Sequence, residues 1–293
     1  MSQTILEKTF GQNLLVHPSQ WVYTYPRERQ VPLQVICVGM PRTGTASLRA
    51  ALTMLGYGHV HHMSTVLSNI GEAHYWISAG KAKWFSTGRV FTRADWDQVL
   101  YSSGATTDFP SSAFADDLIA AYPEAKVVVN YRDVDGWYRS MMDTVGREMT
   151  SPMKKFLAFL GDPYVTAWRD LVDTLWGGFF ACPIADEKRV KEVYEQHYNR
   201  IREMVPPERR YEMRIGEGWE GLCKFLGKDV PQAEYPRVND RETFALAQDF
   251  ILKEALKRTL WRVGSGLAIA TLAVAAVLYG DRCWDWARGI MNQ

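Results

Sequence analysis

The residues best suited to chemistry form a short loop that holds two glycines and a cation. Gly39 and Gly44 enclose Arg42, directly after the apolar run Leu33–Val38 and directly before a helical pattern that begins at Thr45. Glycines let a backbone curl around an anion, and the N-terminus of a helix offers free N–H groups to it. A guanidinium can bind two phosphate or sulfate oxygens at once. We therefore predict an anion site that comprises Pro41, Arg42, Thr43, Gly44, Thr45 and Ala46.

The same loop departs from the loop of ATP-hydrolysing proteins. Their loop continues after the second glycine with Lys and then Ser or Thr, where this chain has Thr45 and Ala46. The missing Lys and the displaced hydroxyl, which would hold magnesium, disfavour phosphoryl transfer from a metal–nucleotide complex. A kinase or NTPase stays as an alternative function.

A second candidate anion site lies downstream. The apolar stretch Lys126–Tyr131 predicts a strand that ends next to Arg132, and Ser140 lies on the helix that follows. Arg132 offers a forked cation and Ser140 a hydroxyl donor near a helix start. This combination suits a phosphate monoester.

The elements that must position these residues alternate between strands and helices. Such alternation is typical of a mostly parallel sheet that is covered by helices on both faces. We predict an α/β, three-layer P-loop fold with a central, mostly parallel sheet of about five strands. The strands are expected at Leu33–Val38, His59–Met63, Ala105–Asp108, Lys126–Tyr131 and Arg210–Ile215.

The composition is that of an ordinary globular protein. Hydrophobic residues make up 47% and charged residues 23% of the 293 residues, which excludes a disordered or collagen-like chain. The 34 Lys and Arg residues nearly balance the 33 Asp and Glu residues, so the formal net charge is +1. A general nucleic-acid binder needs a basic surplus, and no nucleic-acid partner is therefore expected.

The C-terminus contains an uncharged run from Val263 to Gly280. As a helix this run reaches about 27 Å, close to the hydrocarbon core of a bilayer, which is about 30 Å thick. Basic residues flank the run, and the positive-inside rule leaves the preceding domain in the cytosol. We predict a hydrophobic helix that is a single-pass C-terminal membrane anchor. The alternative is an Ala-rich helix buried against the domain or in a homo-oligomer interface.

Two motifs, in order along the chain, resemble those of the sulfotransferase family. Pro41-Arg42-Thr43-Gly44-Thr45 is similar to the family's 5′-phosphosulfate loop, usually Pro-Lys-Ser-Gly-Thr, and Arg132 followed by Ser140 is similar to its 3′-phosphate site. The segment Gly218-Trp219-Glu220-Gly221-Leu222 resembles the fungal-type branch of this family. The resemblance implies 3′-phosphoadenosine 5′-phosphosulfate (PAPS) as the donor and a small-molecule hydroxyl acceptor. A sulfuryl group carries less negative charge than a phosphoryl group, so no required metal is expected.

The chain also departs from the cytosolic members of that family. They carry an Arg-Lys-Gly segment near the C-terminus as a third cofactor contact, and this chain has none. Arg214 and Arg237 are the two candidates to replace it. Ser47 stands where those enzymes have a Trp that stacks on adenine.

The resemblance further implies a position for the catalytic base. Cytosolic sulfotransferases use the His of Thr-His-Leu-Pro, and the equivalent stretch here is Thr107-Asp108-Phe109-Pro110. Asp108 is thus the first candidate base, and a cap of the helix that opens at Ser111 is its alternative role. His62, at the C-terminal end of a strand, is the second candidate base. Arg42 would stabilise charge on the leaving oxygen.

We therefore expect a sulfotransferase that transfers the sulfuryl group of PAPS to a hydroxyl of a lipophilic small molecule. A membrane-tethered protein that keeps the fold with lost or altered chemistry is the third function class. The expected organisation is an N-terminal arm at 1–30, a sulfotransferase-like P-loop domain at 31–245, a linker helix at 246–262, the membrane helix at 263–280 and a tail at 281–293.

Overall fold

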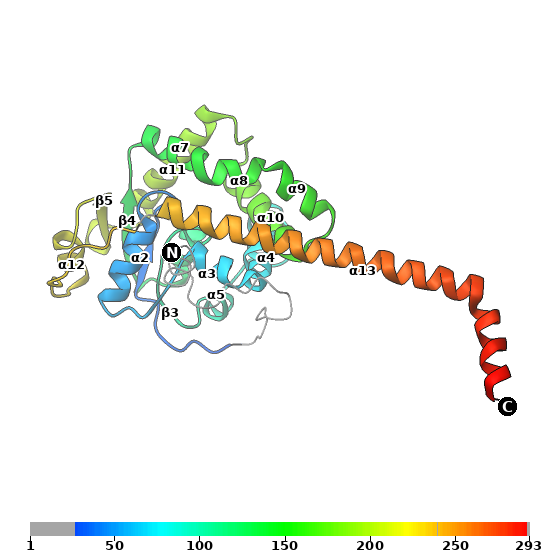
Figure 1. Ribbon diagram of the computed structural model, residues 1–293. Coiled ribbons are helices and arrows are strands. Elements are labelled where there is room, and N and C mark those ends of the chain that lie inside the picture. Colours follow the sequence, from blue (N-terminus) through cyan, green and yellow to red (C-terminus); the bar gives the residue numbers. More distant parts are fainter. Residues whose placement is uncertain (1–26, 239, 292–293) are drawn as a thin grey trace.

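A single parallel sheet organises the chain. The computed structural model describes residues 27–238 and 240–291, with side chains described up to residue 271 except at 240, 268 and 269 (Figure 1). Within these residues five parallel strands pair in the order β2-β3-β1-β4-β5. The predicted α/β fold with a parallel five-stranded sheet is confirmed. The strands are β1 (Val35–Cys37), β2 (His59–His61), β3 (Ser103–Thr106), β4 (Lys126–Tyr131) and β5 (Arg210–Arg214).

Helices connect and cover the strands. The first five α-helices are α2 (Thr45–Met54), α3 (Met63–Ser68), α4 (Ala73–Trp84), α5 (Arg93–Val99) and α6 (Ala115–Ala121). Those that follow are α7 (Val134–Met141), α8 (Arg147–Thr150), α9 (Pro152–Phe159), α10 (Pro163–Leu175), α11 (Glu187–Met204), α12 (Glu220–Leu226) and α13 (Asp240–Met291). Two π-helical turns, Met142–Gly146 and Trp176–Phe180, extend α7 and α10.

The two faces of the sheet belong to two separate hydrophobic cores. On β4, Val127 and Val129 lie in one core and Val128 lies in the other, as strand alternation requires. Leu48 of α2 and Leu222 of α12 join Val128 on the smaller side, and α4, α6, α7, α10 and α11 supply the larger side. The predicted three-layer arrangement therefore follows from strands that are apolar on both faces.

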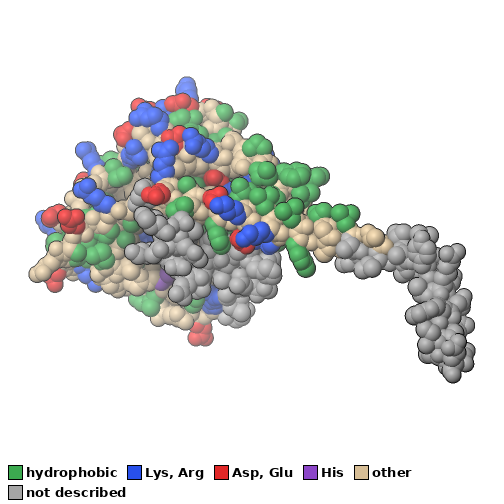
Figure 2. Space-filling view, in the orientation of Figure 1, with side chains coloured by type: hydrophobic (Ala, Val, Ile, Leu, Met, Phe, Trp, Pro, Cys, Tyr) green, Lys and Arg blue, Asp and Glu red, His purple; other side chains and the backbone are tan. Residues whose placement is uncertain are grey.

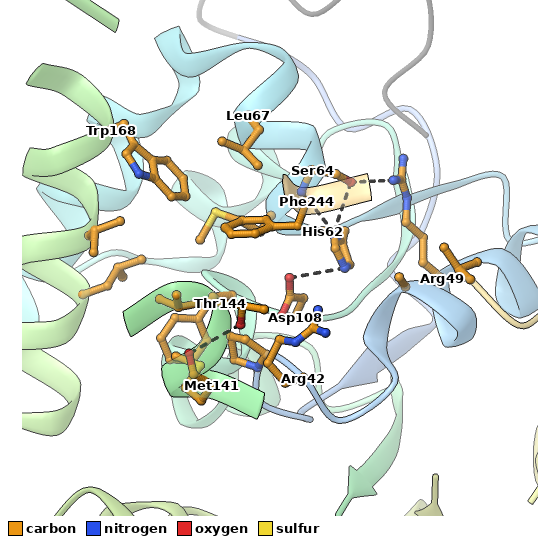
Figure 3. Close-up of a pocket in the computed structure, with 18 of the residues that line it drawn as sticks. Arg42, Arg49, His62, Ser64, Leu67, Asp108, Met141, Thr144, Trp168 and Phe244 are labelled. Carbon is orange, nitrogen blue, oxygen red and sulfur yellow. Dashed lines mark hydrogen bonds and ion pairs between the residues drawn. The ribbon is translucent and has the colours of Figure 1, made fainter. Parts of the chain in front are cut away.

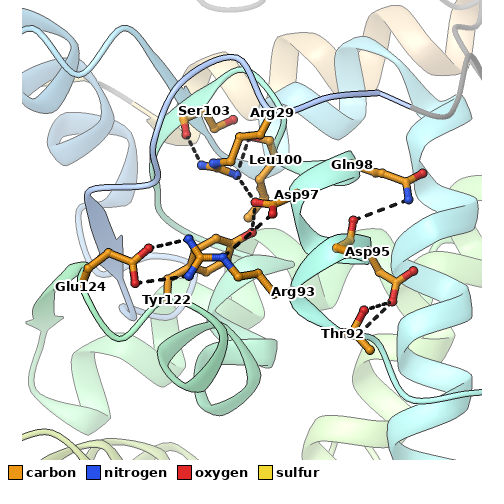
Figure 4. A network of polar contacts seen from close by, with 11 residues as sticks. Arg29, Thr92, Arg93, Asp95, Asp97, Gln98, Leu100, Ser103, Tyr122 and Glu124 are labelled. Carbon is orange, nitrogen blue, oxygen red and sulfur yellow. Dashed lines mark hydrogen bonds and ion pairs between the residues drawn. The ribbon is translucent and has the colours of Figure 1, made fainter.

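A polar network fixes the sheet at the end opposite to the glycine loop (Figure 4). Arg29 donates to the carbonyl oxygens of Leu100 and Ser103 at 3.3 and 3.0 Å and pairs with Asp97 at 3.1 Å. The hydroxyl of Tyr122 donates to the same Asp97 carboxylate at 2.8 Å. These contacts tie the segment before β1 to the elements around β3 and β4, so the central strand starts from a fixed point.

The C-terminal helix α13 is continuous from Asp240 to Met291. The N-terminal part of this helix packs against the domain (Figure 1). Ala247, Ile251 and Ala255 are buried in this contact. Arg258 binds the buried carboxylate of Asp162 with two hydrogen bonds, at 2.9 and 3.0 Å. A charge pair of this kind is geometrically specific, because the planar guanidinium forks onto both oxygens.

The predicted linker at 246–262 and the predicted membrane helix at 263–280 are parts of this one helix. Among the residues that the structure describes, no helix is long and apolar enough to cross a membrane. The side chains of 272–280 and of the predicted tail at 281–293 lie outside that described part, as does most of the predicted arm at 1–30.

Candidate active site

The glycine loop is held from behind by a side chain of β4. Asn130 accepts a hydrogen bond from the N–H of Gly39 at 3.1 Å and donates one to the hydroxyl of Thr43 at 2.9 Å. A Cβ atom on Gly39 would lie 1.9 Å from the Asn130 amide nitrogen, so only glycine fits there. The indole of Trp137 donates to the carbonyl of Pro41 at 2.9 Å. The loop is therefore held in place by hydrogen bonds from its protein neighbours.

The loop ends in a backbone shape that leaves N–H groups open to an anion. Arg42 and Gly44 have left-handed backbones, with φ of 72° and 86°. Gly44 is the N-cap of α2, which has no side-chain cap and no acidic residue in its first turn. The first N–H groups of a helix have no partners within the helix. These donors and the positive end of the helix dipole suit a bound phosphate or sulfate.

A cleft of about 510 Å³ opens beside the loop and contains the second predicted anion site. Arg132 and Ser140 both line it, so the structure brings the two predicted sites together. Ser140 accepts a hydrogen bond from Nε of Arg42 at 3.3 Å. Further lining residues include Arg214, Arg237, Arg241 and the ring of Tyr235, and no acidic side chain is among the described residues that line the cleft. The cleft thus fits a ligand with several negative charges.

Three further arginines line the cleft near the predicted anion sites. Arg214 and Arg237, the two alternatives from the sequence, both line the cleft, and Arg241 of α13 joins them. Arg214 donates to the hydroxyl of Tyr131 at 2.8 Å. Sequence reasoning missed Arg241 because nothing in its local pattern shows that α13 begins at the rim of this cleft.

A second cavity of about 410 Å³ adjoins the cleft (Figure 3). Arg42, Ala46 and Val238 line both spaces, so the anion loop forms part of the wall between them. The apolar lining of the second cavity includes Met63, Leu67, Phe109, Met141, Trp168 and Phe244. The charged and titratable side chains of the cavity, which are Arg42, Arg49, His62 and Asp108, lie together at one end of the cavity (Figure 3).

The two candidate bases, Asp108 and His62, are direct partners at that end. Nε2 of His62 lies 3.2 Å from Oδ2 of Asp108, and both side chains are buried. Nδ1 of His62 accepts the backbone N–H of Ser64 at 3.0 Å. Burial lowers the pKa of His62 well below its usual value, so the ring is neutral. With Nδ1 acting as an acceptor, the ring proton sits on Nε2 and points to the carboxylate.

The backbone at Asp108 has an unusual conformation. Pro110 is the N-cap of the turn Ser111–Phe114, and the carbonyl of Asp108 accepts the N–H of Ser112 at 2.9 Å. Asp108 has a left-handed backbone with φ of 68°. Asp and Asn tolerate this region better than most residues.

Two further polar residues complete the end of the cavity. Arg49 of α2 donates to the hydroxyl of Ser64, which itself contacts Nδ1 of His62 at 3.0 Å. Thr45 places its hydroxyl 3.3 Å from Nε2 of the same ring. Burial lowers the pKa of Arg49, and the nearby charge of Asp108 acts in the opposite direction. Sequence reasoning missed Arg49, although it lies one helical turn after Thr45 on the same face of α2.

The two histidines of β2 have partners outside this site. His59 contacts the hydroxyl of Ser103 at 2.9 Å, and His61 pairs with Glu72 at 2.7 Å. No group of three metal-ligating side chains is found in the part of the chain that the structure describes.

Two buried histidines make the folded protein sensitive to acid. Burial lowers the pKa of His197 to about 4, and it also lowers the pKa of His62. The unfolded chain therefore binds more protons than the folded chain between about pH 6.5 and pH 4, and stability falls as the pH falls through this window. Each of these groups contributes a slope of up to about 1.4 kcal/mol per pH unit.

Urea unfolding from about pH 8 to pH 4.5 measures this slope. We expect the free energy of unfolding to be flat above the window and to decline within it. His197→Asn should flatten the decline, because it removes a buried titrating ring whose Nε2 donates to the carbonyl of Val38 at 2.8 Å. An unchanged slope in that variant would mean that other groups dominate acid unfolding.

The fold and the site together define a P-loop α/β protein that has Thr45 at the position of the ATP-binding lysine and carries its cation at Arg42, before the second glycine. A family profile described as "Sulfotransferase domain" matches residues 34–244. The chain belongs to this sulfotransferase family. It is also 29% identical over 210 residues to the "Ava biosynthesis cluster protein M" of Aspergillus versicolor, which covers 70% of this chain and 80% of that protein. The predicted membership in the fungal-type sulfotransferase-like group is thereby confirmed.

Proposed function

We propose that this protein transfers the sulfuryl group of PAPS to a hydroxyl group of a lipophilic small molecule. The observation that carries the proposal is the shared wall of the two cavities. Arg42 and Ala46 of the anion loop, together with Val238, line both the arginine-rich cleft and the apolar cavity. A group-transfer enzyme needs its donor and acceptor sites to meet at one point.

The residues of the cleft fit the donor. The loop and the first turn of α2 would hold the 5′-phosphosulfate, and Arg132 with Ser140 would hold the 3′-phosphate. PAPS supplies an activated sulfuryl group when it is bound. Arg42 stabilises negative charge next to the shared wall, and it stays protonated because the pKa of an arginine is too high for proton donation.

The cavity fits an acceptor that is apolar over most of its surface and carries its hydroxyl at one end. Phe109, Trp168 and Phe244 line the body of the cavity, and Asp108 lies at the end next to Arg42 (Figure 3). Such a distribution orients a ligand, because a hydroxyl placed among the apolar groups would lose its hydrogen bonds with water.

Within this reaction Asp108 is the base and His62 is a positioning residue. The Nε2 proton of neutral His62 points to Asp108, so this ring nitrogen has no free lone pair for the acceptor's proton. The carboxylate of Asp108 accepts that proton as the new S–O bond forms. His62, Ser64 and Arg49 orient the carboxylate for this step.

Calorimetric titration of the full chain with 3′-phosphoadenosine 5′-phosphate, and separately with Mg·ATP, tests the donor site. We expect binding of the first ligand and a Kd that rises about 10- to 100-fold in Arg132→Ala, because a hydrogen bond to a charged group contributes about 1.5–3 kcal/mol. Arg189→Ala is the matched control. Arg189 is an exposed arginine outside the cleft, and it forms an ion pair with Glu192.

Two results would contradict the donor assignment. An Arg132→Ala variant with an unchanged Kd would remove the 3′-phosphate site from the cleft. Binding of Mg·ATP in place of the 3′-phosphorylated ligand would favour a kinase or NTPase, the alternative that Thr45 and Ala46 disfavour.

A further inference from the structure

The surface formed by α9 and the middle of α13 exposes large apolar side chains. On α9, Phe156 and Phe159 are 55% and 84% exposed. On α13, Leu260, Val263 and Leu267 are 72%, 51% and 66% exposed. We call these side chains the α9–α13 patch; Figure 2 shows hydrophobic side chains gathered where α9 lies against α13. Single exposed apolar residues are ordinary, but a group of large ones marks a site of interaction.

The two helices form one continuous surface because they are joined beneath the patch. Leu157 of α9 and Ala255 of α13 are buried together in a small hydrophobic core. At the end of α9, Arg262 of α13 donates to the carbonyl of Gly161 at 2.6 Å. The patch is therefore a rigid feature of the fold.

Both helices of the patch carry basic side chains near it. The sequences Pro152–Phe159 and Ala255–Gly280 contain Lys and Arg and no Asp or Glu. Lys155 of α9 and Lys257 of α13 are exposed, and Lys257 pairs with Glu254 one turn earlier. Apolar side chains with a basic rim are the composition of helices that lie in the interface of anionic membranes.

We propose that the α9–α13 patch docks on the surface of an anionic lipid bilayer. Phe156, Phe159 and Leu260 insert among the headgroups, and Lys155 and Lys257 contact anionic lipid. A second copy of this chain is a poorer occupant, because a twofold pair would place the same basic side chains against each other. This docking requires no spanning helix and does not depend on the sulfuryl-transfer activity.

Vesicle flotation of the full chain tests the docking surface. The probes are vesicles of phosphatidylcholine alone and vesicles with about 30% phosphatidylserine. We expect binding to the second kind, weakened at least about tenfold by Phe156→Ser with Phe159→Ser, because two aromatic side chains would no longer enter the interface. The matched control is Val90→Ser with Val230→Ser, which changes side chains that are 65% and 50% exposed elsewhere on the chain.

The α9 variant separates this proposal from an anchor made by the uncharged run alone. Val263–Gly280 is intact in that variant, so equal flotation of variant, control and unchanged protein would overturn the patch as the docking surface. A lack of flotation of the unchanged protein would overturn it as well. So would a stable dimer in sedimentation that the α9 variant dissociates, because the patch would then bind a second copy.

Discussion

Asp108→Asn is expected to lower kcat by about 10²- to 10⁴-fold while the Kd for 3′-phosphoadenosine 5′-phosphate stays within about twofold of its original value. The amide keeps the shape of the side chain, tolerates the left-handed backbone at φ of 68° and still accepts the Nε2 proton of His62. It has no basic lone pair for the acceptor's proton. The change therefore removes the proton acceptor and little else.

Turnover of PAPS with a lipophilic phenol, together with calorimetry of the product nucleotide, measures both quantities. Asp173→Asn is the control, because Asp173 is an exposed carboxylate on α10 that pairs with Arg169. His62→Gln should have a smaller effect on kcat than Asp108→Asn, since His62 acts through the carboxylate. If the His62 variant lost activity to the same extent while Asp108→Asn stayed active, His62 would be the base.

Arg42→Ala is expected to lower kcat by about 10²- to 10³-fold, the usual effect of removing a cation that stabilises transition-state charge. Ala keeps a Cβ atom in the left-handed backbone, so the local conformational preference changes little. The guanidinium lies where the cleft and the cavity meet, and its loss should reduce kcat more strongly than it weakens nucleotide binding.

Arg42→Lys is the informative companion variant. Lys stands at this position in the usual sulfotransferase loop, so we expect it to retain activity within about tenfold of the unchanged enzyme. Single-turnover assays with saturating PAPS separate the chemical step from binding. Full activity of Arg42→Ala would place the charge stabilisation on another arginine of the cleft.

The sequence was sufficient to predict most of the fold because the local patterns agree with the tertiary structure. Val127, Val128 and Val129 are apolar on both faces of the predicted strand, and Lys126–Tyr131 forms β4 with the expected bounds. The two glycines and the helical pattern after them predicted where the anion loop lies, and the structure has this loop between β1 and α2. Such segments are predicted correctly because strands that are buried on both faces are mostly apolar runs.

The sequence could not reveal how Asp108 and His62 meet. Each follows its own strand, and their contact arises because β2 and β3 are neighbours in the sheet. The sequence presented them as rival bases, whereas the ring nitrogen bonded to Ser64 makes one the partner of the other. Strand order is a property of long-range packing, and a local pattern carries little information about it.

The sequence also did not predict that the C-terminal helix lines the candidate site. Its composition predicted a linker and then a membrane segment, but Arg241 reaches the cleft and Phe244 reaches the cavity. Their side chains are ordinary for a helix, and only the path of the chain after β5 brings them there. The part of the site that α13 supplies therefore needed the structure.

The left-handed backbones at Arg42 and Asp108 have a consequence for laboratory evolution of this protein. A residue with a Cβ atom is about 1–2 kcal/mol less favourable in this conformation than glycine. Selection for heat resistance alone will therefore favour glycine at both positions and discard the two side chains to which we assign the reaction. A thermostable library of this fold needs a simultaneous screen for turnover, because two accessible stabilising changes lie at the proposed active site.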